Sequence, residues 1–539
     1  MIRNPILRGF NPDPSIVRVG DDYYIATSTF EWFPGVQIHH SRDLIHWRLV
    51  SRPLRRPSQL DLRGVPDGCG IWAPCLTHKD GVFYLTYSVV LRYGHTTVSG
   101  VNGLALRDFH NVLVTASAVE GDWSDPILLN SSGFDPSLFH DEDGRTYLLN
   151  MLWDHRPDQP HFGGIILQEY SLKDRALIGE RRVIYTGTEL GFTEGPHLLR
   201  RDGWYYLIVA EGGTGWDHAV TMARSRRIDG PYETCPTGPI LTSRGRQDNA
   251  LQRAGHGDLV QARDGSWLIA YLCGRSLPGR RNCVMGRETA IQPMRWRADG
   301  WLETLDGQGA PALTADSPEP EVGEAAATVL HHDFDAVELP EEFQWPRSPH
   351  PERLFSLSER PGFLRLYGRE SLGSHFEQAL VARRQQAFCI SASIRLDYAP
   401  RNFQQSAGLV LYYNARKYHY CYVTWDVDIG RHLRILSAEA CEGGSALPER
   451  YPLADGPVEI RASVDYDRLR FGYRQGVDSA WTWLPVTLDM SWLSDEAGPQ
   501  ALPNFTGTFV GMACQDMSGD RLPADFDGFS YEEAGLPEG

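Results

Sequence analysis

Thr193-Glu194-Gly195-Pro196-His197 is followed, eight residues after Glu194, by the turn and strand-like run Asp202-Gly203-Trp204-Tyr205-Tyr206-Leu207. Four other short stretches have the same design, in which a pair of Asp and Gly leads into an aromatic or apolar run. Their aspartates are Asp21, Asp80, Asp143 and Asp264, and only Asp21 follows its glycine instead of preceding it. An Asp-Gly pair between two such runs is a strong signal for a tight β-hairpin.

Counting back eight residues from each of these aspartates gives five equivalent positions: Asp13, Trp72, Asp135, Glu194 and His256. They are separated by 59, 63, 59 and 62 residues. A repeat of this length, built from short strands and Gly/Asp turns, is typical of a β-propeller with one blade per repeat. We therefore predict an all-β chain whose residues 1–308 form a five-bladed propeller. The five equivalent side chains should then lie around one central axis.

Within the first repeat, residues 23–27, 36–41 and 44–47 have the composition of strands. The composition changes after the fifth repeat, and residues 309–327 are rich in Gly, Ala, Pro and Glu, as an interdomain linker is. Residues 328–539 contain alternating apolar runs with few helical patterns, for example 409–413 and 418–423. This second region is predicted to be one β-sandwich.

The chain has 539 residues and a formal net charge of −17. Proteins bind nucleic acids and anionic membranes through clustered Lys and Arg residues. The negative net charge therefore argues against either partner and fits a neutral substrate. The N-terminus has no apolar run resembling a signal peptide, and no run of 18 apolar residues occurs. The nine cysteines include no Cys-x-x-Cys pair, which favours free thiols in a reducing compartment. We expect a cytoplasmic protein.

Three carboxylates, from Asp13, Asp135 and Glu194, should converge at one end of the propeller. Buried unpaired charges are costly, and Arg287 could neutralise only one of the three. Cleavage of a glycosidic bond, by contrast, requires two carboxyl groups, one protonated and one ionised. A third carboxylate nearby would raise the pKa of the donor by like-charge repulsion. Each residue alone could be a turn or capping residue, but their matched positions favour catalysis.

The sequence resembles family 43 of the glycoside hydrolases at its acidic motifs, 11–15 (Asn-Pro-Asp-Pro-Ser), 134–137 (Phe-Asp-Pro-Ser) and 193–197. With residues 30–36 (Phe-Glu-Trp-Phe-Pro-Gly-Val) and the C-terminal sandwich, the whole chain is similar to the two-domain β-xylosidases of that family. The resemblance implies a sandwich of the concanavalin-like, jelly-roll type that closes the pocket of the propeller.

The resemblance also implies an inverting reaction with three assigned roles. Asp13 would be the general base that holds the attacking water, and Glu194 the general acid that protonates the departing sugar oxygen. Asp135 would adjust the pKa of Glu194 and orient it. In an inverting pair, the carboxyls of Asp13 and Glu194 should be about 6.5–9.5 Å apart to leave room for the water.

For substrate binding, the resemblance points to Arg287 at the sugar and to Trp72 and Phe30 as aromatic walls. An aromatic residue of the sandwich should narrow the pocket, with Phe505 preferred and Phe509 as the other candidate. We expect His256 to hydrogen-bond beneath the sugar. Relatives that hold calcium or another divalent ion near the equivalent histidine make His256 the one candidate for a metal ligand, although no neighbouring carboxylates stand at metal-binding spacing. No cofactor is expected to be required.

A pocket that admits only a chain end would make the enzyme exo-acting, releasing xylose from the non-reducing end of β-1,4-xylo-oligosaccharides. α-L-Arabinofuranosidase activity could accompany this reaction or dominate it. A glycan-binding propeller without hydrolytic activity and a retaining fructan hydrolase both stay open as hypotheses. Similar enzymes suggest a homo-oligomer, a dimer or a tetramer.

Overall fold

The protein is described by a computed structural model that covers residues 1–93, 106–324, 327–439, 444–476, 478–498 and 504–534. Over these ranges the regular structure consists of strands and two 3-10 helices, η1 (Pro351–Arg353) and η2 (Met490–Trp492), so the predicted all-β class is confirmed. Cys441 lies outside the described residues, and the eight described cysteines are free thiols. No described helix is both long enough and apolar enough to cross a membrane.

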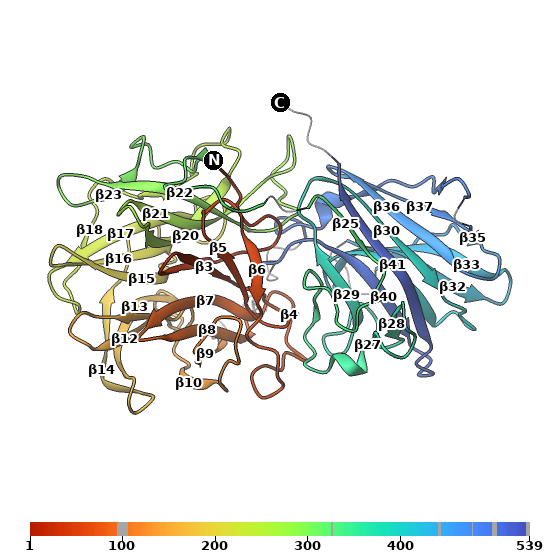
Figure 1. Cartoon of the computed structure of the whole chain (residues 1–539), viewed down its shortest axis with the longest axis horizontal. Helices are drawn as coiled ribbons and strands as arrows, with labels where there is room; N and C mark the ends of the chain where they lie inside the picture. Colours follow the sequence, from red (N-terminus) through yellow and green to blue (C-terminus); the bar gives the residue numbers. More distant parts are fainter. Residues whose placement is uncertain (94–105, 325–326, 440–443, 477, 499–503, 535–539) are drawn as a thin grey trace.

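Five antiparallel sheets follow one another along the N-terminal part of the described chain and form the predicted five-bladed propeller, the red-to-green half of Figure 1. Blade one contains β2 (Ser15–Val19), β3 (Asp22–Thr27), β5 (Gln37–Ser41) and β6 (Arg48–Ser51). Blade two contains β7 (Gly70–Lys79), β8 (Val82–Arg92), β9 (Asp108–Ala116) and β10 (Ile127–Asn130). Blade three contains β11 (Ser137–His140), β12 (Thr146–Trp153), β13 (Phe162–Ser171) and β14 (Ala176–Tyr185).

Blade four contains β15 (Glu194–Arg201), β16 (Trp204–Glu211), β17 (Ala219–Ser225), β18 (Glu233–Thr234) and β19 (Leu241–Thr242), the last two both paired with β17. Blade five contains β20 (Gln252–Gln261), β21 (Trp267–Gly274), β22 (Glu288–Trp296) and β23 (Leu302–Thr304). In blades two and four the Asp-Gly pair is the whole hairpin loop, because Lys79 pairs with Val82 and Arg201 pairs with Trp204. Both residues of each loop have positive φ, the geometry that Asp-Gly favours.

One left-handed residue recurs at the inner strand of every blade, two residues before the strand in blades one and three and within its first half in the other blades. These residues are Asp13, Ala73, Asp135, Gly195 and His256, with φ between 38° and 58°. In blades two, four and five the strand pairing shifts register here, as a β-bulge does. Bulges re-aim side chains, and left-handed non-glycine residues are strained positions that often mark functional sites. In blades two and four, the equivalent positions found by counting back from the Asp-Gly turns are Trp72 and Glu194, each one residue before the left-handed residue.

The predicted strand at residues 44–47 is wrong. Leu44 has φ +63°, and the Asp43 carboxylate accepts hydrogen bonds from the backbone N–H groups of Ile45 and His46. An aspartate that binds the following N–H groups makes a turn, so the chain bends there and the fourth strand of the blade starts at Arg48.

Two sheets in the C-terminal half form the predicted sandwich, the teal-to-blue half of Figure 1. One has the order β27 (Phe355–Ser356), β28 (Leu364–Tyr367), β41 (Pro523–Glu533), β30 (Cys389–Asp397), β36 (Val458–Asp465), β37 (Arg468–Arg474) and β38 (Thr482–Trp483), with β25 (Val329–His332) on β41 and β39 (Leu488–Asp489) on β37. The other has the order β29 (Ala379–Arg384), β40 (Phe509–Asp516), β31 (Gln405–Asn414), β32 (Lys417–Asp426), β33 (Gly430–Glu439) and β34 (Ser445–Ala446), with β35 (Tyr451–Pro452) on β33.

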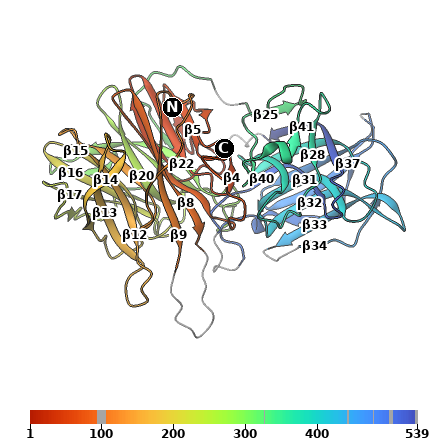
Figure 2. The same cartoon turned by 90° about the horizontal axis from the view of Figure 1, so that it is seen from below.

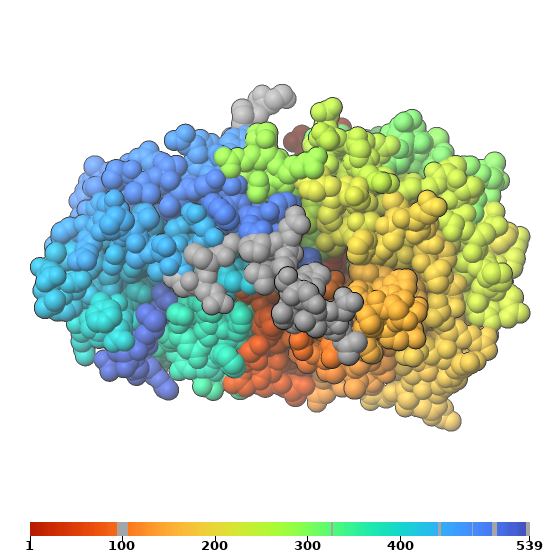
Figure 3. Space-filling model, turned by 180° about the vertical axis from the view of Figure 1, so that it is seen from behind, coloured from red at the N-terminus to blue at the C-terminus, as the bar shows by residue number. Residues whose placement is uncertain are grey.

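The two domains share a buried interface rather than a loose connection. β4 (Trp32–Phe33) of the propeller pairs with β26 (Trp345–Pro346), and the Trp32 ring stacks on Phe509 with centroids 3.6 Å apart. In Figure 2, β4 and β40 face each other at the junction, and Figure 3 shows the two halves as one continuous body. The segment predicted as a linker runs along the propeller, where β24 (Thr314–Ala315) pairs with β1 (Ile2–Arg3). The sandwich is therefore fixed beside the propeller.

Candidate active site

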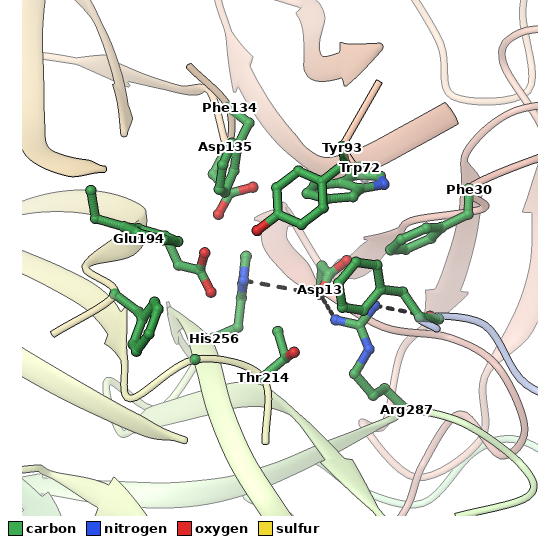
Figure 4. Close-up of a pocket in the computed structure, with 14 residues that line it drawn as sticks. Asp13, Phe30, Trp72, Tyr93, Phe134, Asp135, Glu194, Thr214, His256 and Arg287 are labelled. Carbon is green, nitrogen blue, oxygen red and sulfur yellow. Dashed lines mark hydrogen bonds and ion pairs between the residues drawn. The ribbon is translucent and has the colours of Figure 1, made fainter. Parts of the chain in front are cut away.

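One pocket at the end of the propeller axis brings together all eight predicted site residues (Figure 4). They are Asp13, Asp135, Glu194, Phe30, Trp72, His256, Arg287 and Phe505. Asp13 and Asp135 stand two residues before β2 and β11, and Glu194 is the first residue of β15. Figure 4 shows all three carboxylates pointing into the same space. Because seven of these residues come from the propeller and Phe505 comes from the other domain, the pocket depends on the interface between them.

The Asp13 carboxylate is held at both oxygens. Arg287 Nη1 lies 2.9 Å from Oδ1, and Ser28 Oγ donates to Oδ2 at 2.7 Å. Ser28 Oγ in turn accepts a hydrogen bond from the backbone N–H of Ala73, next to Trp72. Charge-assisted hydrogen bonds are short and directional, so the two contacts fix the orientation of the carboxylate. Asp13 therefore points in a defined direction and has a cation beside one of its oxygens.

Glu194 has the opposite environment. No hydrogen bond or ion pair joins its carboxyl to another described residue, and burial raises its pKa well above the ordinary value, with further contributions from the negative charges of Asp135 and Asp13. Arg287 offsets this only in part. The pocket thus disfavours the ionised form of Glu194 and favours the protonated form, as a proton donor requires.

Asp135 is coupled to Glu194 through the backbone. The N–H of Gly195 donates to Asp135 Oδ2 at 2.9 Å, so the carboxylate is anchored to the residue that follows Glu194. Burial, and then the charge of Asp13, raise the pKa of Asp135 to about 8, while the Gly195 hydrogen bond opposes them. Two buried carboxyls in one pocket titrate as a pair, so Asp135 can influence both the position and the acidity of Glu194.

His256 lies beside Asp13, with Nδ1 4.0 Å from Asp13 Oδ1, too far for a hydrogen bond. Burial lowers the pKa of His256 to about 4, so the ring is neutral near pH 7 and the contact is not an ion pair. Within the described residues no group of three or more His, Cys, Asp or Glu side chains could hold a metal ion. Calcium takes six to eight oxygen ligands, and the nearby carboxylate of Asp13 is already bound by Arg287. The described residues therefore do not fit directly coordinated calcium.

Aromatic rings form the walls of the pocket. The Trp72 ring lies 5.5 Å from both Phe30 and Phe505 between centroids, and its Nε1 donates to the carbonyl of Gly68. The Phe505 carbonyl accepts a hydrogen bond from Arg287 Nη2 at 3.0 Å, which ties the sandwich to the residue that binds Asp13. Phe509, the other candidate, is fully buried against Trp32 and does not line the pocket.

Further lining residues were not singled out from the sequence. They are Tyr93, Phe134, Phe162, Phe192, Gly213 and Thr214. Two signals were available: Phe134 and Phe192 stand one and two residues before Asp135 and Glu194, and Thr214 belongs to a glycine-rich loop with no phosphate-binding pattern. Tyr93 and Phe162 carry no comparable mark: Tyr93 follows β8 and Phe162 begins β13, so neither stands beside an acidic motif in the sequence.

The model of the glycosyl hydrolases family 43 matches residues 2–302, and that of the beta xylosidase C-terminal concanavalin A-like domain matches residues 331–532. The chain is therefore a glycoside hydrolase and belongs to family 43.

Relatives match over the whole length. A Humicola insolens protein named xylosidase/arabinosidase 43B is 49% identical, with 99% of this chain and 98% of that protein covered. A Bacillus subtilis protein named beta-xylosidase is 46% identical, with 99% of each chain covered. The crystal structure of a xylan beta-1,4-xylosidase from Bacillus halodurans superimposes with a TM-score of 0.94 at 50% identity, covering 99% of this chain and 100% of that one.

Proposed function

We propose that this hydrolase is an exo-acting, inverting β-xylosidase that releases xylose from the non-reducing end of β-1,4-xylo-oligosaccharides. The observation that carries the proposal is that the carboxyl groups of Asp13 and Glu194 have different environments in the same pocket. Asp13 is bound by Arg287 and Ser28, whereas Glu194 is buried without a partner among the described residues and has a raised pKa. Glycoside hydrolysis with inversion needs one ionised carboxyl as the general base and one protonated carboxyl as the general acid.

In this mechanism, Asp13 removes a proton from a water molecule while that water attacks the anomeric carbon. Glu194 gives its proton to the glycosidic oxygen as the bond to the leaving sugar breaks. The attack comes from the face opposite the leaving group, so the configuration at the anomeric carbon inverts. The charge of Asp135 raises the pKa of Glu194, and Asp135 orients the acid through Gly195. The separation of about 6.5–9.5 Å between the carboxyls of Asp13 and Glu194 stays a prediction.

Exo action is supported by the walls of the pocket. Phe30, Trp72 and Phe505 line the pocket in contact with one another, and the backbone carbonyl of Phe505 is hydrogen-bonded to Arg287. A site of this kind has room for the terminal sugar of a chain, with the rest of the chain directed outwards. Because the Humicola insolens relative is named for both activities, α-L-arabinofuranosidase activity is the second candidate, as a side activity or as the main one.

The test is turnover of xylobiose by the wild-type chain and by Glu194→Ala. The wild type should release xylose, and Glu194→Ala should bind xylobiose with similar affinity while its kcat falls by about 10²–10⁴-fold, the usual contribution of general acid catalysis. A glycan-binding protein would bind xylobiose and show no turnover in either form. Parallel assays on the nitrophenyl derivatives of β-xylose and α-L-arabinofuranose would establish which sugar the pocket prefers.

We also propose that the enzyme needs no cofactor, acts in the cytoplasm and assembles as a dimer or tetramer. Support for the first point is the poor fit of the described pocket residues to calcium. Size-exclusion chromatography with light scattering would determine the oligomeric state.

A further inference from the structure

A buried glutamate next to the active site has no role in the proposed reaction. Glu211 ends β16, the strand that pairs with β15, and its neighbour Ala210 stands opposite Glu194 in that pairing. The side chain of Glu211 is completely inaccessible to solvent. No ion pair joins it to a cation in the part of the chain that the structure describes. A carboxylate in such a place needs another source of stabilisation.

Hydroxyl and amide groups supply it. Glu211 Oε1 accepts hydrogen bonds from the backbone N–H of Thr188 at 2.6 Å and from Thr193 Oγ1 at 2.9 Å. Oε2 accepts from Thr188 Oγ1 at 2.8 Å and from Thr221 Oγ1 at 2.7 Å. An ionised carboxylate has the acceptor capacity for all four donors. Three of the four come from the loop between β14 and β15.

That loop leads directly to the proposed acid. Thr193 is the residue before Glu194, and Phe192, which lines the mouth of the pocket, has φ +53°. Gly187 packs so closely that an added Cβ would lie 1.8 Å from Thr193 Oγ1 and 2.6 Å from Glu211 Oε1. Glu211 therefore holds both ends of residues 188–193 and leaves Glu194 little freedom on its N-terminal side.

On its C-terminal side, Glu194 is held by the hydrogen bond from Gly195 to Asp135. We infer that Glu211 is a positioning residue for the proton donor: it fixes Thr193, as Asp135 fixes Gly195, so that the Glu194 carboxyl meets the glycosidic oxygen. This inference rests on the proposed function, since it assigns Glu211 to the acid half of that reaction.

A role in positioning the acid can be separated from a role in folding by the choice of leaving group. Proton donation matters for a sugar leaving group, which is a poor one, and matters little for 2,4-dinitrophenolate, which leaves without help. A misplaced acid should therefore slow hydrolysis of xylobiose much more than hydrolysis of 2,4-dinitrophenyl β-xyloside. A general loss of folded protein would lower both rates by the same factor.

Three variants test the inference. We expect Glu211→Ala to lower kcat/KM for xylobiose by about 10²-fold, as small displacements of catalytic groups do, and that for the dinitrophenyl glycoside by less than about threefold. Glu211→Gln should keep most of the xylobiose activity, because its amide oxygen can serve Thr188 N–H and Thr193, while hydroxyls can rotate to accept from its NH2. Thr193→Val, which removes only the direct link, should show the same selective loss on a smaller scale and decides the question if Glu211→Ala does not fold.

The matched control is Glu319→Ala, since Glu319 is a buried glutamate that accepts hydrogen bonds from Tyr23 and Arg263 away from the pocket. Glu319→Ala should change kcat/KM for xylobiose and for the dinitrophenyl glycoside by the same factor. Equal losses on both substrates, or no loss, for Glu211→Ala and Thr193→Val would overturn the inference, provided that Glu194→Ala shows the selective loss. If Glu194→Ala itself lacks selectivity, the assignment of the acid fails, and the inference fails with it.

Discussion

Loss of the buried ion pairs of Arg253 should weaken the contact between the two domains and destabilise the enzyme. Arg253 belongs to β20 of the propeller, and its guanidinium lies 2.9 Å from both Asp495 and Glu496 of the sandwich. Its Nε also donates to the carbonyl of Thr214, which lines the pocket. Asp495 further accepts a hydrogen bond from Tyr413, whose hydroxyl contacts the backbone N–H of Thr506. Arg253 thus fastens the segment around Phe505.

The magnitude follows from burial. Arg253 and Asp495 are each about 5% exposed or less as side chains. Removing one partner of a buried ion pair costs about 3–5 kcal/mol, because the other charge remains buried without compensation. Spread over the unfolding entropy of a chain of 539 residues, this cost should lower the Tm of Arg253→Met by roughly 3–4 °C. An exposed pair of similar length should matter far less, and Arg227 with Asp229, at 2.7 Å, is the matched control.

The assay is thermal unfolding of the wild type, Arg253→Met, Arg227→Met and the triple variant Arg253→Met/Asp495→Asn/Glu496→Gln. The triple variant should recover part of the lost stability, since it no longer buries unpaired charges. The reasoning would be refuted if Arg253→Met shifted the Tm no more than Arg227→Met does, or if the triple variant were less stable than the single one.

Three further predictions concern the pocket. The kcat/KM for xylobiose should fall as the pH rises through the raised pKa of Glu194. Asp135→Asn removes one repelling charge, so this fall should begin at lower pH in the variant. An unchanged pH profile would show that Asp135 does not raise the pKa of Glu194. Phe505→Ala should raise KM for xylobiose about 5- to 30-fold through loss of about 1–2 kcal/mol of aromatic contact, with the Tm nearly unchanged because Arg287 binds the backbone carbonyl; an unchanged KM would remove Phe505 from the site. Dialysis against EDTA should leave kcat/KM and the Tm within error, whereas restoration of lost activity by calcium would show that a metal is needed.

The propeller could be predicted because its hairpins are local. Asp80-Gly81 and Asp202-Gly203 encode their turns in two residues, so counting from them finds every blade. The count cannot register a bulge, however. It therefore chose Trp72 and Glu194, while the left-handed residues of those blades are Ala73 and Gly195. Trp72 and Glu194 nevertheless both line the pocket, as predicted.

Contacts between distant parts of the chain were beyond sequence patterns. Ser28 binds Asp13 from the neighbouring strand, and Arg253 finds its partners more than 200 residues away. Glu211 resembles any strand-end glutamate until the loop that precedes Glu194 is seen to fold over it. Such residues are defined by tertiary hydrogen bonds, which a single sequence does not specify.

The most direct test of the proposed mechanism is the anomer that first appears when xylobiose is cleaved, followed by proton NMR before mutarotation. If Asp13 activates a water while Glu194 protonates the leaving oxygen, the newly released xylose must appear as the α-anomer. Initial appearance of the β-anomer would mean a double displacement through a covalent intermediate, and the roles given to both acids would be wrong.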